Sequence, residues 1–389
     1  MKYVMRMKWL LAATLLLTGC KNFWVSASNT CTANCSTVSS GIFYVLNSNA
    51  GQVEIAGYSI VNGTLTPLTG SPFGLPSGPY SVAVAPNNSF LYVGTPAGIY
   101  LYSIGSGGVL TLSSNVPIFN DLAAYTMKVD STNSWLVEAS GLGNLYAIPI
   151  SPATGATTGT AQQVALPGIA PHQLVISSDN ANVFVALGNA GTAVIPFAAA
   201  NTDPLPATVG ATIAVKTTGN SAISVAMDPI NRLLYIGEAS NTSGSNSGTL
   251  RAINYSSVSG VPTEVAGSPF ATGGVSPASI LPVASGAYVY VANATVANSS
   301  TGNVTGFALT ASGTTYNLTA LSSTASAGTT PASLAEDSTG TVVLLVNSGG
   351  NPDLGVYTFD TTVPGKLDSA LTSATGTDPV GALTVVAAP

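Results

Sequence analysis

Side chains that can carry out acid–base chemistry are scarce in this chain. Only 6% of its 389 residues are charged, and His172 is its single histidine; in ordinary domains about 25% of residues are charged. An imidazole titrates near neutral pH and can move a proton at a reacting atom. One imidazole excludes a histidine-rich metal centre, so we expect no metal and no cofactor, although a cation held by oxygen ligands alone stays open.

The motifs of several common catalytic sites are missing. The closest match to Gly-x-Ser-x-Gly lies at residues 244–248 and has Asn246 at its centre, so the sequence predicts no nucleophile elbow. There is no Walker loop and no Gly-x-Gly-x-x-Gly motif. The two arginines beyond residue 20, Arg232 and Arg251, stand outside any basic cluster, which disfavours a phosphorylated substrate.

The charge balance argues against nucleic acid as a partner. The first 19 residues hold three of the nine basic residues, so their removal leaves 6 basic against 15 acidic residues, a net charge of −9. Neutralising phosphates requires clustered Lys and Arg, which the sequence lacks.

A repeated phrase of three short strands organises the rest of the chain. Residues 79–104 show period-two alternation, aromatic and β-branched residues, and turn signals between the strands. The first strand of this phrase recurs six more times, at spacings of 45, 47, 51, 55, 54 and 48 residues. A period of this length predicts the blades of an all-β propeller. The seven starts are Pro79, Ala124, Pro171, Ala222, Pro277, Pro331 and Pro379.

The two ends of the repeat predict seven blades in a closed ring. The last start, Pro379, is followed by one strand, whereas residues 42–47 resemble the second strand of a blade. The C-terminal strand should therefore complete the N-terminal blade, so that residues 41–389 form a seven-bladed β-propeller. An open solenoid, the rival repeat fold, would need capping repeats instead.

The first 40 residues are predicted to direct export. Residues 1–19 combine basic residues, a short apolar run and Leu-Thr-Gly before Cys20, which resembles a bacterial lipobox. The resemblance implies lipidation of Cys20, so we expect a protein of the bacterial cell envelope that meets the membrane through its lipid anchor only. Lys21 favours the outer membrane over the inner one. An ordinary secretory signal is the alternative.

Residues 20–40 are predicted to form a flexible tether, because they are rich in Ser, Thr and Asn and lack periodicity. Cys31 and Cys35 lie within this tether and are the two cysteines left once Cys20 is lipidated. In an oxidising compartment we expect them to form a small local disulfide.

One face of the predicted ring should collect the polar side chains. The start of the first strand and the end of the second lie at the same edge of an antiparallel blade, so seven such edges form the mouth of the channel. His172 lies just after one start, and Glu238 ends a second strand. Long loops rich in Gly, Asn and Ser follow the later second strands. The expected binding residues of this face are Asn47, Asn293, Asn347 and Asp353, of which Asn293 and Asp353 are also typical turn formers.

The repeat resembles a known family of propeller enzymes. Gly-Ser-Pro-Phe occurs at residues 70–73 and 267–270, Leu-Tyr-Val at 91–93 and Tyr-Val-Ala-Asn at 290–293. Across residues 41–389 these phrases resemble the seven-bladed propeller lactonases, which are related to 6-phosphogluconolactonase and to the carboxymuconate-cyclising enzymes. The resemblance implies ring-opening hydrolysis of a lactone, or its reverse, at the channel mouth.

The family's site residues match this chain in part. Pro171-His172 matches the family's Pro-His, whereas residues 221–224 (Ser-Ala-Ile-Ser) stand where the family has Gly-Pro-Arg-His. Glu238 falls one residue before the family's glutamate. The resemblance implies that a neutral His172 activates water, that Glu238 orients this water or shares the proton, and that Arg251 stabilises the oxyanion. The alternatives are a hydrogen-bonded rim histidine and a solvated loop carboxylate.

Three functions stay open at this point. The first is a lactone hydrolase, which the preserved Pro-His and Glu238 favour. The second is a non-catalytic propeller that binds a glycan, a peptide or a protein partner at the same face, which the loss of the Arg-His pair favours. The third is a structural envelope protein. The ligand would be a small lactone or another polar molecule at the channel mouth, and we expect a monomer.

Overall fold

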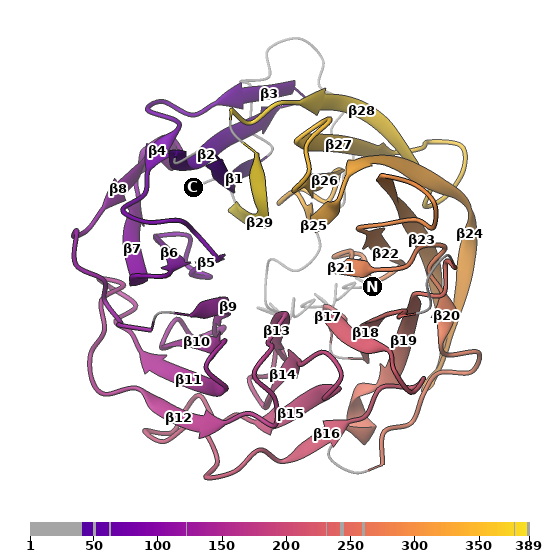
Figure 1. Ribbon diagram of the computed structural model, residues 1–389, viewed down its shortest axis with the longest axis horizontal. Helices are drawn as coiled ribbons and strands as arrows, with labels where there is room; N and C mark the ends of the chain where they lie inside the picture. Colours follow the sequence, from indigo (N-terminus) through magenta and orange to yellow (C-terminus); the bar gives the residue numbers. More distant parts are fainter. Residues whose placement is uncertain are drawn as a thin grey trace, which may run out of the picture. The chain divides into compact units, whose positions relative to one another are not determined.

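Alternating apolar residues and frequent turn residues make this chain a succession of short strands. The computed structural model describes residues 41–386, except residues 50–51, 62–63, 122, 231, 242–244, 259–260 and 377. Within this part of the chain the strands form seven sheets that stand around a central channel (Figure 1). The predicted seven-bladed all-β propeller is confirmed. The predicted signal segment, the tether, Cys20, Cys31 and Cys35 lie outside the described residues.

Each blade is an antiparallel sheet whose first strand is innermost. Three blades follow one another in the first half of the chain. They are β5 (Ser81–Val84), β6 (Phe90–Thr95), β7 (Gly98–Ile104) and β8 (Leu110–Leu112); β9 (Ala124–Val129), β10 (Trp135–Ser140), β11 (Asn144–Pro149) and β12 (Gln162–Ala165); and β13 (Gln173–Ile176), β14 (Asn182–Ala186), β15 (Thr192–Pro196) and β16 (Ala211–Ile213).

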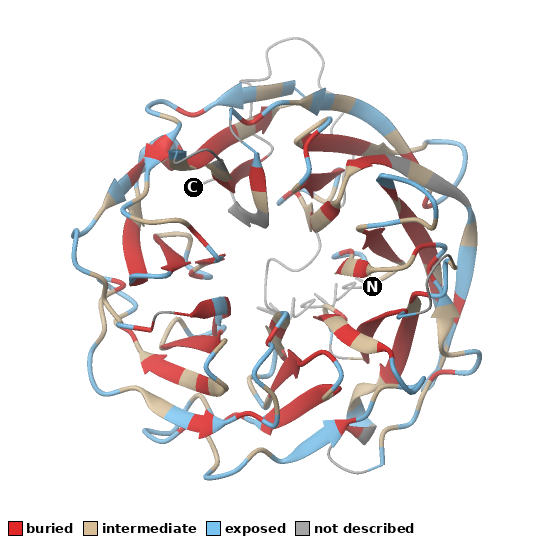
Figure 2. Ribbon diagram, in the orientation of Figure 1, coloured by how far each residue is buried: buried red, intermediate tan, exposed pale blue. Residues whose placement is uncertain are grey.

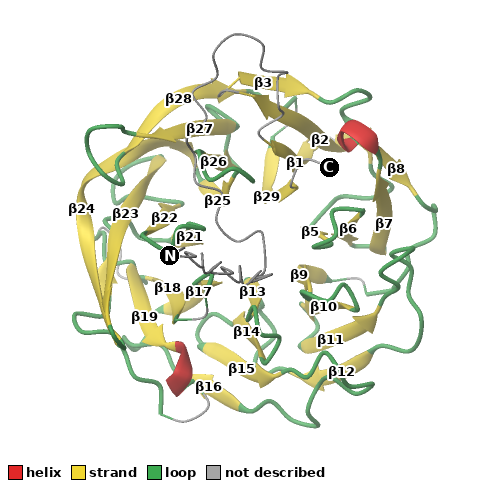
Figure 3. Cartoon of the chain, turned by 180° about the vertical axis from the view of Figure 1, so that it is seen from behind, coloured by secondary structure: helices red, strands yellow, loops and turns green. Residues whose placement is uncertain are grey.

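Three further blades follow in the second half. They are β17 (Ser221–Met227), β18 (Leu233–Ala239), β19 (Thr249–Asn254) and β20 (Phe270–Ala271); β21 (Pro277–Pro282), β22 (Tyr288–Asn293), β23 (Thr301–Ser312) and β24 (Thr315–Thr329); and β25 (Pro331–Glu336), β26 (Val342–Asn347), β27 (Leu354–Phe359) and β28 (Leu367–Ser373). Two short 3-10 helices, η1 (Ser106–Gly108) and η2 (Tyr255–Ser257), lie toward the outside of the ring, as Figure 3 shows from behind.

The remaining blade joins the two ends of the propeller. Its innermost strand is β29 (Pro379–Val386), which pairs with β1 (Gly41–Asn49) and places Val385 opposite Phe43. The sheet continues outward through β2 (Gln52–Val61) to β3 (Thr64–Pro67), and β4 (Phe73–Gly74) also pairs with β2. The predicted closure by the C-terminal strand is confirmed.

Apolar side chains fill the contacts between neighbouring blades. The described residues contain seven buried apolar clusters, and each one combines residues from two adjacent sheets. Phe43 and Val45 of β1, for example, pack with Leu344 and Val346 of β26. Burial is concentrated in the inner and middle strands, whereas the outermost strands are largely exposed (Figure 2). This distribution explains how a long chain with few charges folds without one large core.

The innermost strands are tied to one another around the channel. The channel-facing edge of an innermost strand has no neighbour within its own sheet. In five of the seven contacts between innermost strands, a side chain of one strand bonds to the backbone of the next within the described residues. These bonds are Ser81 Oγ to Ala124 O at 2.7 Å, Leu174 N to Thr126 Oγ1 at 3.1 Å, Val225 N to Gln173 Oε1 at 3.0 Å, Ser224 Oγ to Pro277 O at 2.6 Å and Leu334 N to Ser279 Oγ at 3.1 Å.

Candidate functional site

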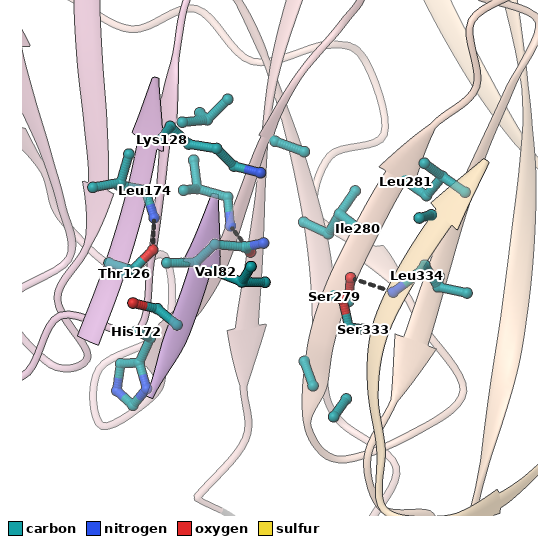
Figure 4. Close-up of a pocket in the computed structure, with 18 of the residues that line it drawn as sticks. Val82, Thr126, Lys128, His172, Leu174, Ser279, Ile280, Leu281, Ser333 and Leu334 are labelled. Atoms are coloured by element: carbon teal, nitrogen blue, oxygen red, sulfur yellow. Dashed lines mark hydrogen bonds between the residues drawn. The ribbon is translucent and has the colours of Figure 1, made fainter. Parts of the chain in front are cut away.

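The second residues of five of the seven repeated phrases line the mouth of the channel. Three neighbouring blades supply rings at this position, namely Tyr80, Tyr125 and His172. Two blades on the other side supply Ala278 and Ala332. All five residues line one cavity of about 520 Å³ within the channel, part of which is drawn in Figure 4. The mouth is therefore asymmetric, with a wall of rings facing small side chains.

His172 lies at the mouth with its imidazole open to the cavity. Its backbone N–H donates to Ala186 O at 2.9 Å, which fixes the residue just before β13. The side chain is exposed, and its ring borders Gly188, where a Cβ atom would lie 3.5 Å from Nε2. The surrounding channel wall lowers the pKa of His172 by desolvation, which favours the neutral imidazole. The imidazole has no hydrogen bond to any residue that the structure describes.

Tyr80 and Tyr125 form an aromatic pair beside His172. Their ring centroids lie 5.1 Å apart and the rings meet edge to face at 80°. Both side chains are partly open to solvent, with exposed fractions of 40% and 44%. The ring of Tyr125 packs over Gly141, where an added Cβ atom would lie 2.7 Å from it, so a larger residue at Gly141 would displace this ring. The pair can stack on a flat ring and donate a phenol hydrogen bond.

Glu238 and Arg251 lie together in another part of the molecule. Arg251 Nη1 donates to Glu238 Oε1 at 2.8 Å, and Arg251 Nη2 donates to Glu264 Oε1 at 2.7 Å. The Glu238 carboxylate is fully buried and also accepts the Lys216 N–H at 2.9 Å. Neither Glu238 nor Arg251 is among the residues that line the cavity with His172. The structure thus brings two of the three expected catalytic residues together and leaves His172 apart from them.

Asn293 and Asn347 end β22 and β26 as predicted, whereas Asn47 lies two residues before the end of β1. Pro277 pairs with Asn293, Pro331 with Asn347 and Pro379 with Asn47, which confirms the alignment of these phrases at one edge of the ring.

The side chains of these residues hold the loops between strands. Asn47 Nδ2 donates to Thr375 O at 2.8 Å, and Asp353 Oδ2 accepts the Thr375 N–H at 2.8 Å, so Asn47 and Asp353 meet at Thr375. Asn347 Nδ2 donates to Pro352 O at 2.7 Å, and Asn293 Nδ2 donates to Thr272 O at 2.9 Å. The three asparagines are fully buried. A role in binding a ligand remains a prediction for all four residues.

A buried pair of carboxyl groups was not expected from the sequence. Glu138 of β10 is fully buried and Asp121, in the loop before β9, is nearly so. Neither oxygen of Glu138 accepts an N–H or O–H bond from a described residue. Desolvation, together with the charge of Asp121 and a hydrogen bond to it, raises the pKa of Glu138 to about 10. At neutral pH Glu138 therefore holds its proton.

Several residues that line the cavity were not expected from the sequence, although their positions in the repeated phrase indicate where they lie. Tyr80 and Tyr125 occupy the same position of the repeated phrase as His172, so aligning the phrases would have placed them at the mouth. Lys128 and Glu336, which come later in their repeated phrases, line the same cavity. The pairing of Glu238 with Arg251 has no such signal, because it depends on which side chains face each other between β18 and β19.

The fold, but not the sequence, connects this chain to known proteins. No family model and no curated protein matches it. Among solved structures, it is similar to a candidate 6-phosphogluconolactonase from Bacteroides fragilis, with a TM-score of 0.69, 17% identity and coverage of 91% of this chain and 100% of the other. This chain and that protein share one overall fold.

Two other structures give the same result. A periplasmic gluconolactonase from Pseudomonas aeruginosa has a TM-score of 0.67 at 18% identity, with 90% of this chain and 99% of the other covered. A candidate 6-phosphogluconolactonase from Bacteroides uniformis has a TM-score of 0.67 at 16% identity, with 89% and 99% covered. At these identities the likeness concerns the propeller architecture alone. Across the described residues, no helix has the length and hydropathy needed to cross a bilayer.

Proposed function

We propose that this protein is a lipid-anchored envelope hydrolase that opens a non-phosphorylated lactone at the channel mouth. The observation that carries the proposal is the position of the chain's single histidine, His172, on the rim of the channel cavity beside two tyrosines. The lactonase-like fold supports it. A phosphorylated substrate is disfavoured because no arginine lines the cavity.

The proposed reaction uses groups that face the cavity. The lactone ring stacks on Tyr80 and Tyr125, and neutral His172 takes a proton from water as the water attacks the carbonyl carbon. A tyrosine hydroxyl donates a hydrogen bond to the oxyanion that forms. The ring C–O bond then breaks, the leaving oxygen takes the proton from His172, and a hydroxy acid is released. In this scheme Glu238 and Arg251 have a structural role. Their ion pair stabilises the blade of β17 to β20, which lies next to the blade that follows His172.

Ring opening of δ-valerolactone and glucono-δ-lactone, followed by acid release in a pH-stat, tests the proposal. We expect His172→Ala to lower kcat/KM by about 10²-fold or more. Since desolvation lowers the pKa of His172, the wild-type rate should rise with pH through a value below about 6.5 and be flat at neutral pH. Lys366→Met, which changes a surface lysine, should match wild type. If the wild type, His172→Ala and Lys366→Met all show rates equal to the uncatalysed background, the hydrolase proposal is wrong.

A binding function is the second candidate. It is favoured by the imidazole of His172 having no carboxylate partner among the described residues, since a general base is usually oriented by one. In that case the aromatic wall would hold a sugar or another flat ring without chemistry. Saturation-transfer NMR with gluconate, glucose and a glycan fragment would show contact to the tyrosines in a protein that has no lactonase activity.

The proposed envelope anchor can be tested separately. A cell grown with an alkyne fatty acid should label the wild-type protein and bring it into the membrane fraction, whereas Cys20→Ala should remain unlabelled. Labelling that survives the substitution would contradict lipidation at Cys20.

A further inference from the structure

We propose that the deeper part of the channel is a binding site for a small organic monocarboxylate, held by Lys128. This site is separate from the mouth and does not depend on lactone hydrolysis. Lys128 is the fifth residue of its repeated phrase and lines the channel cavity. The equivalent residues in the other six phrases are all apolar, so one blade alone places a charge at this level. They are Ala83, Val175, Ala226, Leu281, Ala335 and Leu383.

The strand β9 presents Lys128 to the channel. Along β9 the side chains of Tyr125 and Lys128 are exposed, whereas the four others are buried. Figure 4 shows Lys128 and His172 at opposite ends of the drawn part of the cavity. The two residues mark two levels, since three residues along a strand span about 10 Å. A molecule bound at Lys128 therefore leaves the mouth accessible.

The charge of Lys128 is not balanced by the part of the protein that the structure describes. No described residue forms a hydrogen bond or an ion pair with its ammonium group, whereas Lys216 and Lys366 both pair with carboxylates. Desolvation alone acts on the pKa of Lys128 and lowers it. An anion that enters the channel can pair with this exposed ammonium group, and the surrounding protein makes the attraction stronger than it is in bulk water.

The other titratable groups of the cavity fit a ligand with one negative charge. Glu336 of β25 is the one carboxylate among the lining residues. Its Oε2 atom accepts the Ala284 N–H at 2.6 Å, and β25 is not a neighbour of β9 in the ring. His172 is neutral. A second carboxylate on the ligand would find no cation among the lining residues and would be repelled by Glu336.

A hydrogen-bond donor and an apolar surface complete the site. Gln173, on the neighbouring β13, lines the cavity and uses its Oε1 atom to accept the Val225 N–H at 3.0 Å, so its amide nitrogen is directed to donate elsewhere. Met127, Met227 and Leu281 also line the cavity. The carboxylate would take bonds from Lys128 and Gln173, and an apolar body would contact the remaining wall.

Benzoate, benzyl alcohol and phthalate test this proposal by calorimetry on the full chain. Benzoate should bind, benzyl alcohol should bind about tenfold more weakly or not at all, and phthalate should also be weaker because of its second carboxylate. Lys128→Met, which restores the apolar character of the other blades, should abolish benzoate binding and keep the unfolding midpoint. Lys128→Arg should retain it, and Lys366→Met should bind like wild type.

A second measurement identifies the atom. In protein labelled with ¹³C at lysine Cε, benzoate should shift the Lys128 signal and leave those of Lys216 and Lys366 unchanged. Equal shifts of all lysine signals, equal binding of benzoate and benzyl alcohol, or full binding to a folded Lys128→Met variant would each overturn the proposal. Loss of lactonase activity in any variant has no bearing on it.

Discussion

At the residue scale, the ion pairs around Arg251 explain the fate of two expected catalytic groups. Arg251 is about 5% exposed and lies between the carboxylates of Glu238 and Glu264. Its Nη1 atom also donates to Ala214 O at 2.7 Å. Ala214 lies in the loop that connects β16 to β17, the first strand of the blade that contains Arg251. A buried cation with three oxygen acceptors is held in one geometry. Arg251 therefore fixes the loop before β17 against the strands of its own blade. A catalytic role for either residue remains a prediction.

Replacing Arg251 separates these two roles. Arg251→Met leaves the fully buried Glu238 carboxylate without its cation and leaves Glu264 paired with Lys216 alone. We therefore expect the free energy of unfolding to fall by about 3–5 kcal/mol. Arg251→Met combined with Glu238→Gln should recover part of this loss. Chemical denaturation followed by tryptophan fluorescence measures both. A folded single variant with unchanged stability and no lactonase activity would instead assign Arg251 to catalysis.

The carboxyl pair of Glu138 and Asp121 should make stability depend on pH. Burial raises the pKa of Glu138 to about 10, whereas in the unfolded chain it is near 4.5. Between these values the folded protein holds a proton that the unfolded chain releases, so the free energy of unfolding falls as pH rises. Glu138→Gln keeps a donor for Asp121 and removes the proton. It should stabilise the protein at pH 8 by on the order of 1 kcal/mol or more, relative to pH 5.

Denaturation midpoints at the two pH values give this comparison. Asp203→Asn is the matched control, because Asp203 is exposed in a loop. If the wild-type and Glu138→Gln proteins keep the same pH dependence, Glu138 does not hold a proton in the folded protein at these pH values.

At the scale of elements, the third residue of each repeated phrase protects the edge of the innermost strand. Ser81, Thr126, Gln173, Ser224 and Ser279 all occupy this position and all bond to the backbone of the next blade. Ser279→Ala would leave the buried N–H of Leu334 without its acceptor. We expect a loss of about 1–3 kcal/mol in the free energy of unfolding. Ser103→Ala, in β7, removes only a solvent-exposed bond of 3.5 Å to Thr111 O and should cost less than about 0.5 kcal/mol.

The sequence predicted the elements better than the site. Short-range alternation and turn residues predict the number of blades, the strand order and the pairing of Pro277 with Asn293. These signals lie between residues that are close together in the sequence. The partners of Glu238 and the burial of Asn47 depend on loops from the preceding blade, which meet these residues only in the folded ring. His172 was placed correctly because its position in the phrase fixes its level in the channel, whereas its chemistry cannot be read from that position.

At the scale of the whole molecule, closure depends on one strand. Without β29 the β1 edge would be unpaired and the contacts of β29 with β5 and β25 would be lost. A chain that ends at residue 378 should therefore aggregate or elute as an expanded species in size-exclusion chromatography. Adding a peptide of residues 379–389 should restore the compact form. A compact, monomeric chain without β29 would contradict this account.

The pairing of β29 with β1 also determines which blade can be completed last during folding. Synthesis delivers β1 first and β29 last, so the sheet that contains β1 stays incomplete until every other blade has been made. During that interval the unpaired edge of β1 can pair with a strand from another newly made copy. Overexpression should therefore yield domain-swapped dimers joined between β1 and β29.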